Sequence, residues 1–235
     1  MIIYTFKRKW QAFGNYYLSV MASIAYCEKH NYQYRHIPME HISHKENKSK
    51  MIEFIGIPVD KYDQTDNCIS SDILKKTRYS KKPSIYFTDN VLKKLRTYYY
   101  SINKPEIKED IDIVIHIRRG DVDGIREGSY MSRYTSNEEY LKIIHFLKEK
   151  YPTYKIKIIS EGKIEDFIEL KTENTSFYLN QNLQKAFHYM VRSKVLVCAK
   201  SNLSYCAGIL NENEVYYLPH WQKKLDNWID ISKLI

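Results

Sequence analysis

Short apolar runs alternate with amphipathic stretches along the second half of the chain. Residues 113–117 are β-branched and almost uniformly apolar, as in a strand that is buried on both faces of a parallel sheet. Further strands are expected where similar runs recur, at 154–159, 176–179, 194–198 and 215–218. Helices are expected where apolar residues recur at helical spacing, after the capping-box sequence 136–139, through Phe167 and Leu170, at 183–191 and at 205–210. Strand and helix in this order predict a right-handed, doubly wound parallel sheet.

The first half of the chain repeats this pattern less cleanly. Strands are expected at 2–6 and 32–37, and helices at 16–29 and 89–100. The polar, lysine-rich stretch 42–80 is expected to be loop, with a short helix near 51–55. Residues 103–106 are the best candidate linker, which predicts two halves, 1–105 and 106–235.

The composition is typical of a folded globular protein. Hydrophobic residues make up 43% of the 235 residues and aromatic residues 14%, which supports a sizeable core and argues against disorder. No apolar run is long enough for a transmembrane helix, and at the N-terminus apolar residues precede basic ones, the reverse of a secretory signal. A cytoplasmic protein without a transmembrane segment is therefore expected.

Neither cysteine nor histidine spacing indicates a metal site. The four cysteines lie far apart without a CxxC pair, at positions 27, 68, 198 and 206, so buried thiols are expected rather than a zinc site or a disulfide framework. No His/Asp/Glu cluster has ligand spacing, and we expect no metal. The formal charge of +9 favours an anionic partner such as nucleic acid, phosphorylated lipid or a nucleotide.

The apolar run at 113–117 ends in charged side chains. Arg118, Arg119 and Asp121 follow it, and ligands of open α/β sheets bind in the crevice beyond the carboxyl ends of the strands. Guanidinium groups are planar, permanently charged donors that suit phosphate oxygens, so the two arginines predict a pyrophosphate site. The alternative is a surface salt bridge from an arginine to Asp121 or Asp123.

Polar residues also separate the run at 194–198 from the helix that follows it. Ser201, Asn202 and Ser204 stand where backbone N–H groups and the helix dipole favour an anion, although such residues are more commonly helix caps. In one parallel sheet this loop and Arg118 open on the same edge, so we expect both to contact one diphosphate.

A third loop precedes the helix expected at 16–29. Gly14 and Asn15 supply an unusual backbone turn and a cap side chain there, which is a loop-to-helix signal. GxGxxG and GxxxxGK sequences are absent, so neither a dinucleotide fold of the usual type nor a P-loop is indicated.

Three of these stretches resemble motifs of one enzyme family. Residues 116–121, HIRRGD, resemble the HxRRxD motif of the GDP-fucose-dependent fucosyltransferases, the α1,2/α1,6 and protein O-fucosyltransferase group. Residues 13–15 are similar to the end of that family's G-x-G-N-Q loop, and residues 201–205 to its S-S/T-F-S-x loop. Their order and spacing agree with the family over nearly the whole chain.

The resemblance implies a fold and a reaction. The fold is α/β and GT-B-like, with two facing Rossmann-like halves that each hold a parallel sheet, the N-terminal half being reduced. Residues 1–105 would form the acceptor-side half and residues 106–235 the nucleotide-sugar-binding half. The reaction is an inverting, metal-independent transfer of L-fucose from GDP-fucose to a sugar hydroxyl of a glycan acceptor. The implied partners are this donor and the glycan, with no further cofactor and no specific nucleic acid.

The resemblance also implies roles for single residues. Arg118 grips the β-phosphate, the serine loop binds the diphosphate, and Asn15 faces the sugar. Asp121, Asp123 and Glu127 are open as the base that takes the acceptor proton; Glu127 ranks first, with Asp121 also orienting Arg118. The other residues expected at the donor site are Gly14, His116, Ser160, Glu161, Asn180, Ser201, Asn202, Leu203 and Ser204.

Departures from the family keep two alternatives open. The first loop lacks the family's first glycine, and Tyr16 replaces its glutamine. Residues 180–182, Asn-Gln-Asn, stand where relatives carry an acidic residue for the guanine edge, so a GT-B transferase using another nucleotide sugar is one alternative. The other is a non-catalytic RNA or polyanion binder, indicated by the net charge and by tyrosines among the basic residues near 96–100.

Overall fold

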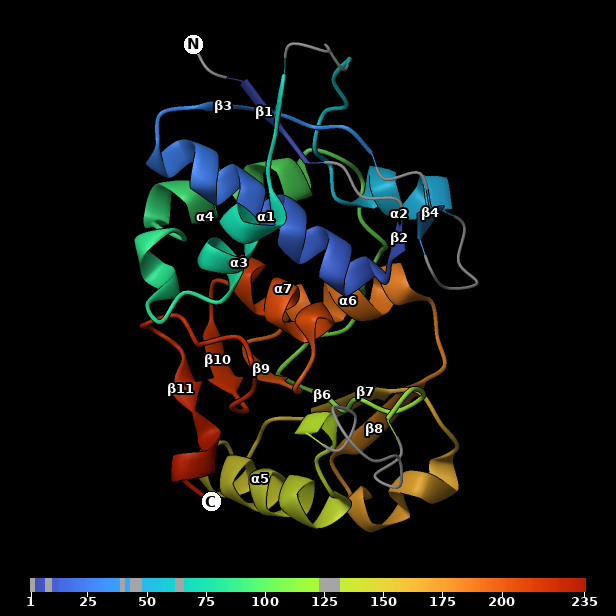
Figure 1. Ribbon diagram of the computed structural model, residues 1–235. Helices are drawn as coiled ribbons and strands as arrows, with labels where there is room; N and C mark the ends of the chain where they lie inside the picture. The colour runs from blue at the N-terminus through green and yellow to red at the C-terminus, as the bar shows by residue number, and fades with distance from the viewer. Residues whose placement is uncertain (1–2, 7–9, 39–40, 43–47, 62–65, 123–131) are drawn as a thin grey trace. The chain divides into compact units, whose positions relative to one another are not determined.

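The computed structural model divides the chain into two compact units (Figure 1). It describes residues 3–6, 10–38, 41–42, 48–61, 66–122 and 132–235. Unit 1 comprises Met1–Lys104 with Trp221–Asp226, and unit 2 comprises Pro105–His220 with Asn227–Ile235. The stretch 221–226 therefore belongs with the first half of the chain, which its position in the sequence did not indicate.

Unit 2 is built on a six-stranded parallel sheet. Its strands are Ile113–His116 (β6), Ile156–Ser160 (β7), Thr175–Leu179 (β8), Val195–Cys198 (β9), Glu214–Tyr217 (β10) and Ile229–Asp230 (β11). They are arranged in the order β11-β10-β9-β6-β7-β8, and all pairs are parallel. Counted from β6 as the first strand this is the order 3-2-1-4-5-6, so the direction of winding reverses between β6 and β9.

Helices cover both faces of this sheet. They are Asn137–Lys150 (α5), Ile164–Leu170 (η3), Leu183–Arg192 (α6), Asn202–Leu210 (α7) and Ile231–Lys233 (η4). Helix α5 lies on one side, and α6 and α7 on the other (Figure 1). The predicted capping box is confirmed: Ser136 Oγ accepts from Glu139 N at 3.1 Å, and the Glu139 carboxylate accepts from Ser136 N at 3.0 Å.

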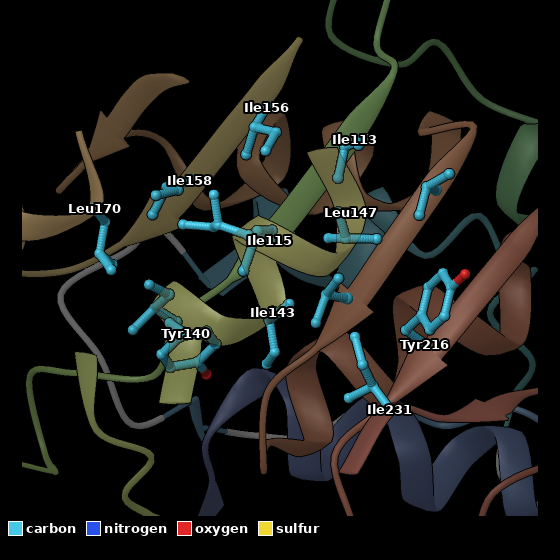
Figure 2. Packing of buried hydrophobic residues seen from close by; sticks show 14 of the residues in the cluster. Ile113, Ile115, Tyr140, Ile143, Leu147, Ile156, Ile158, Leu170, Tyr216 and Ile231 are labelled. Atoms are coloured by element: carbon cyan, nitrogen blue, oxygen red, sulfur yellow. The ribbon is translucent and has the colours of Figure 1, made fainter. Parts of the chain in front are cut away.

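The core between α5 and the sheet explains the apolar run at β6. Ile113 and Ile115 point to the same face, because side chains alternate along a strand, and they pack against Ile143 and Leu147 of α5 (Figure 2). Val114 lies on the opposite face and is also fully buried. Burying each such side chain stabilises the fold by about 1.5–3 kcal/mol, which accounts for a strand that is apolar at every position before His116.

Unit 1 holds a smaller parallel sheet. Strands Gln33–Arg35 (β3), Ile3–Thr5 (β1) and Asn67–Cys68 (β5) pair in that order, and Trp10–Gln11 (β2) pairs with His41–Ile42 (β4). The helices are Phe13–Lys29 (α1), Lys48–Phe54 (α2), Ser71–Arg78 (α3), Pro83–Ile85 (η1) and Asp89–Tyr100 (α4). Helix α1 is buried along most of its length and contacts α3 and α4. A parallel sheet in each half, the smaller in the N-terminal half, agrees with the expected fold class.

Two parts of the sequence prediction for unit 1 were wrong. Helix α3 and strand β5 lie within the stretch expected to be loop; Ser70 Oγ caps α3 by accepting from Ile73 N at 3.3 Å. Helix α1 begins at Phe13 instead of Tyr16, because Ala12 O already accepts from the N–H groups of Asn15 and Tyr16. Among the described residues no helix combines the length and apolar character needed to cross a membrane.

Candidate functional site

Arg118 connects two strand exits of unit 2. Its Nε and Nη2 donate to the Asp121 carboxylate at 3.1 and 2.7 Å, and its Nη1 donates to the Lys200 carbonyl at 3.3 Å. Arg118 follows β6 and Lys200 follows β9, so the guanidinium lies at the point where the winding reverses. The described residues use three of its five N–H groups, and 18% of the side chain is exposed. The described residues therefore leave two donors for an anion at this edge.

Asp121 has the geometry of a partner for this arginine. Burial opposes its ionisation, but the hydrogen bonds and charge of Arg118 outweigh that effect and lower the pKa of the Asp121 carboxyl. A carboxylate held ionised by two guanidinium N–H groups fixes the orientation of the arginine. The same pairing makes it a weak proton acceptor.

Arg119 is engaged in a different environment from Arg118. It donates to the carbonyls of Arg118 and Thr135 at 2.9 and 3.1 Å, and to Asn137 Oδ1 at 2.9 Å. Its guanidinium also lies over the Tyr134 ring, 4.6 Å from the centroid. The sequence left open a salt bridge from either arginine to Asp121 or Asp123, but among the described residues the partners of Arg119 are carbonyl, amide and aromatic groups. Arg119 thus ties the loop after β6 to the start of α5.

His116, the last residue of β6, is buried and uncharged. Burial lowers its pKa to about 3, and the neighbouring positive charge of Arg118 acts in the same direction. Its carbonyl accepts a hydrogen bond from the Tyr140 hydroxyl at 3.3 Å, whereas its Nδ1 has no hydrogen-bonding partner among the described residues. This histidine is therefore neutral at physiological pH and does not act as a cationic phosphate ligand.

The serine loop forms the first turn of α7. Ser201 Oγ caps the helix by accepting from Leu203 N at 3.2 Å. The Ser204 side chain is fully buried, and its hydroxyl lies 3.4 Å from the carbonyls of Ala199 and Ser201. Asn202 and Leu203 are partly exposed. The loop therefore presents the positive end of α7 beside Arg118, while the Ser204 hydroxyl is directed at the backbone.

The predicted residues after β7 and β8 lie on the same edge of the sheet. Ser160 is buried, and its hydroxyl donates to the Glu161 carbonyl at 3.0 Å. Asn180 exchanges two hydrogen bonds with the backbone of Gly162, at 2.9 and 2.6 Å. The Glu161 carboxylate lies against Gly120: a Cβ built on that glycine would be 2.1 Å from Glu161 Oε2. The exits of β6, β7 and β8 are thereby in contact with one another.

Gly14 and Asn15 belong to unit 1 and lie in the first turn of α1, so the turn and cap side chain predicted for them are wrong: the N-cap is Ala12, without a side-chain cap. Asn15 Oδ1 accepts from Arg78 Nη2 at 2.6 Å, and Arg78 Nη1 donates to Ser19 Oγ at 3.1 Å. Arg78 of α3 is thus fixed beside the start of α1, an arrangement that the sequence did not predict because α3 itself was missed.

Two candidate bases, Asp123 and Glu127, lie outside the described residues. Asp121 is the third, and it is paired with Arg118.

Two further basic residues at this edge were missed from the sequence. Lys200 Nζ donates to the Tyr134 carbonyl at 3.1 Å. His220 Nδ1 must donate to the Leu218 carbonyl, 2.9 Å away, because a carbonyl oxygen only accepts. Burial lowers the pKa of His220 to about 4, and the charges of Lys200 and Arg118 act in the same direction. Both residues follow apolar runs that predicted strands. Their position after a predicted strand was the feature of the sequence that could have indicated them.

A metal site is not formed by the part of the chain that the structure describes: no group of three or more His, Cys, Asp or Glu residues there could hold an ion. The cysteines at 27, 68, 198 and 206 are free thiols, three of them buried.

Comparison with known proteins shows that the fold is similar to that of solved structures. No protein-family model matches the sequence, and no curated protein matches it significantly. Among solved structures, the chain is similar to POFUT1 in complex with GDP, with a TM-score of 0.51 and 10% identity over 93% of this chain and 98% of that chain. It is also similar to E. coli heptosyltransferase WaaC with ADP-2-deoxy-2-fluoro heptose, with a TM-score of 0.48 and 10% identity over 97% of this chain and 92% of that chain. The α/β, GT-B-like fold class expected from the sequence is confirmed.

Proposed function

We propose that the protein is a glycosyltransferase that moves L-fucose from GDP-fucose to a sugar hydroxyl of a glycan, with inversion and without a metal ion. The observation that carries this proposal is the position of Arg118 beside the start of α7, at the carboxyl edge between β6 and β9. A guanidinium and a helix N-terminus together suit a diphosphate leaving group. The resemblance of residues 116–121 to the HxRRxD motif and the fold shared with POFUT1, whose structure holds GDP, support the same donor.

In the proposed reaction the acceptor oxygen attacks the anomeric carbon while the bond from that carbon to the β-phosphate oxygen breaks. Negative charge then develops on the departing diphosphate. Arg118 and the positive end of α7 stabilise this charge, since both are fixed before the reaction begins. A carboxylate takes the acceptor proton, and Glu127 is our proposed base because Asp121 is committed to Arg118. Activity is expected to persist in excess EDTA.

A thermal-shift panel of GDP, UDP, ADP and CMP tests the nucleotide. A ligand that binds only the folded state raises the melting temperature, and the increase is larger the further the ligand concentration exceeds Kd. We expect GDP to give the largest increase and Arg118→Lys to remove most of it. If none of the four nucleotides changes the melting temperature, the proposed donor site does not exist.

A transferase that uses another nucleotide sugar is the second candidate. Asn180 Oδ1 accepts from Gly162 N and Asn180 Nδ2 donates to the Gly162 carbonyl, and Asn182 Oδ1 caps α6 by accepting from Lys185 N at 3.0 Å. Neither asparagine presents the acidic group that the family uses for guanine. A larger melting-temperature increase with UDP, ADP or CMP than with GDP would favour this candidate.

Of the three tyrosines behind the polyanion-binding alternative, Tyr100 is exposed, Tyr98 is partly exposed and Tyr99 is buried. Tyr99 is fully buried against Phe54, and Lys104 Nζ lies 3.9 Å from its ring centroid, so this tyrosine offers no surface on which bases could stack. RNA affinity that falls steeply with salt, together with no response to nucleotides, would revive that alternative.

A further inference from the structure

Glu161 is an acidic side chain at the carboxyl end of β7, next to the proposed diphosphate site. Gly120, two residues after Arg118, has a φ of 81°, and a Cβ at this position would overlap Glu161 Oε2. The carboxylate therefore lies directly on the backbone of the loop that carries the arginine. Among the described residues it has no hydrogen-bonding or ion-pair partner, and the residue is exposed. It is an ionisable group at the site to which the proposed reaction assigns no task.

The backbone around Glu161 is held in place on both sides. The Ser160 hydroxyl donates to the Glu161 carbonyl, and the next residue, Gly162, exchanges two hydrogen bonds with the Asn180 side chain. Gly162 also has a positive φ of 122°, which fixes a turn immediately after the acidic residue. The backbone that carries the carboxylate is thus held in place before any ligand arrives, which reduces the entropy cost of binding.

The order of the strands limits where a bound nucleotide can lie. With its diphosphate between β6 and β9, the nucleoside can extend over β7 towards β8, or over β10. At the end of β10, His220 packs against Tyr205 and Tyr217, with ring centroids 5.9 and 5.1 Å apart, and occupies that side. At the end of β7, the Glu161 carboxylate lies over Gly120 and the residue is exposed. The end of β7 is therefore the side that offers an exposed acceptor to the ribose, which joins the phosphates to the base.

We infer that Glu161 accepts hydrogen bonds from the ribose 2′- and 3′-hydroxyls of the donor nucleotide, an assignment that rests on the proposed function. A carboxylate has two oxygens and only accepts, which matches two neighbouring hydroxyl donors. In doubly wound sheets that bind dinucleotides, an acidic residue that follows the first phosphate loop, at a shorter spacing than here, binds the ribose 2′-hydroxyl. Glu161 makes the site selective for ribonucleotides, because an analogue without hydroxyls leaves the carboxylate without its donors.

Calorimetric titration with GDP and 2′,3′-dideoxy-GDP tests this assignment. We expect the wild-type protein to bind GDP about tenfold or more tightly than the dideoxy analogue, as a hydrogen bond to a charged group predicts. Glu161→Gln should reduce this preference to less than about threefold while leaving the affinity for the dideoxy analogue unchanged. Glu165→Gln, which alters an exposed glutamate of η3, should keep the full preference.

The two proposals fail in different ways in this experiment. If GDP, UDP, ADP and CMP all fail to bind the wild-type protein, the proposed function is wrong and the ribose assignment falls with it. If a different nucleotide binds best, the same comparison is made with that nucleotide and its dideoxy form. If the nucleotide binds and Glu161→Gln retains the wild-type preference, the ribose assignment alone is overturned.

Discussion

Arg118 and Arg119 are neighbours in the sequence, yet their side chains have different tasks. Arg118 keeps donors available beside α7, whereas Arg119 is surrounded by carbonyls, an amide and the Tyr134 ring. The difference arises at the end of β6, where successive side chains leave the strand on opposite sides. A sequence motif with two arginines therefore contains one candidate ligand contact and one structural contact.

Arg118→Lys is expected to impair catalysis without unfolding the protein. Lysine keeps the charge but cannot pair with Asp121 through two N–H groups while also reaching the Lys200 carbonyl. We expect a loss of roughly 2–4 kcal/mol in transition-state stabilisation, measured as kcat/KM with GDP-fucose and an accepted glycan. Circular dichroism should remain that of the wild type. Turnover close to the wild-type rate would exclude Arg118 from the diphosphate contact.

Gly120→Ala should destabilise the fold and weaken nucleotide binding together. A φ of 81° is strained for alanine, and its Cβ would overlap the Glu161 carboxylate. We expect a loss of about 1–3 kcal/mol in the free energy of unfolding in urea. The double variant Gly120→Ala, Glu161→Ala should recover little of this loss, because the flexible end of Glu161 can move aside while the backbone strain remains. Recovery of most of the loss in the double variant would show that the overlap, and not the backbone, causes the destabilisation.

At the scale of elements, the apolar runs predicted the centre of unit 2 well because strands β6 and β9 are buried on both faces. Such strands are almost uniformly apolar and are recognisable for that reason, whereas β8 and β11 at the sheet edges are only partly buried and β11 was not predicted. Helix α3 was missed because its exposed face is rich in charged residues, with Leu74 and Thr77 as its buried positions. Tertiary contacts with α1 stabilise it, and a local pattern does not contain them. The sequence indicated the serine loop, but it did not show which serine caps the helix, because that depends on the residue at which α7 begins.

Arg119→Lys tests the connection between the exit of β6 and α5. The substitution removes the planar group that bonds the Thr135 carbonyl and Asn137 Oδ1 and that covers Tyr134. We expect the free energy of unfolding to fall by about 2 kcal/mol, while GDP affinity per folded molecule stays unchanged. Arg118→Lys is the matched control, since it should change binding and not stability. Weakened GDP binding by Arg119→Lys, with stability intact, would reverse the roles assigned to the two arginines.

Each of the two units contains buried, neutral histidine. In unit 1, burial lowers the pKa of His36 to about 4, although the charge of Asp60 acts in the opposite direction. The Tyr16 and Tyr34 hydroxyls lie 3.3 and 3.2 Å from its ring nitrogens. In unit 2, the pKa values of His116 and His220 are lowered to about 3 and 4. No sequence pattern indicated this property, because it depends on what covers each ring.

These histidines should make the whole protein sensitive to mild acid. Below pH 6.5 each ring takes up a proton in the unfolded chain but not in the folded protein. The free energy of unfolding therefore decreases as the pH is lowered, until the pH reaches the folded pKa. For a histidine with a folded pKa near 4, the contribution to the free energy of unfolding is about 2 kcal/mol smaller at pH 5 than at pH 7. The free energy of unfolding, measured in urea, should therefore decrease less between pH 7 and pH 5 for His36→Gln than for the wild type, by about this amount. His145→Gln, a change on the exposed face of α5, should decline as the wild type does. An equal decline in the wild type and in His36→Gln would mean that His36 already binds a proton in the folded protein at pH 5.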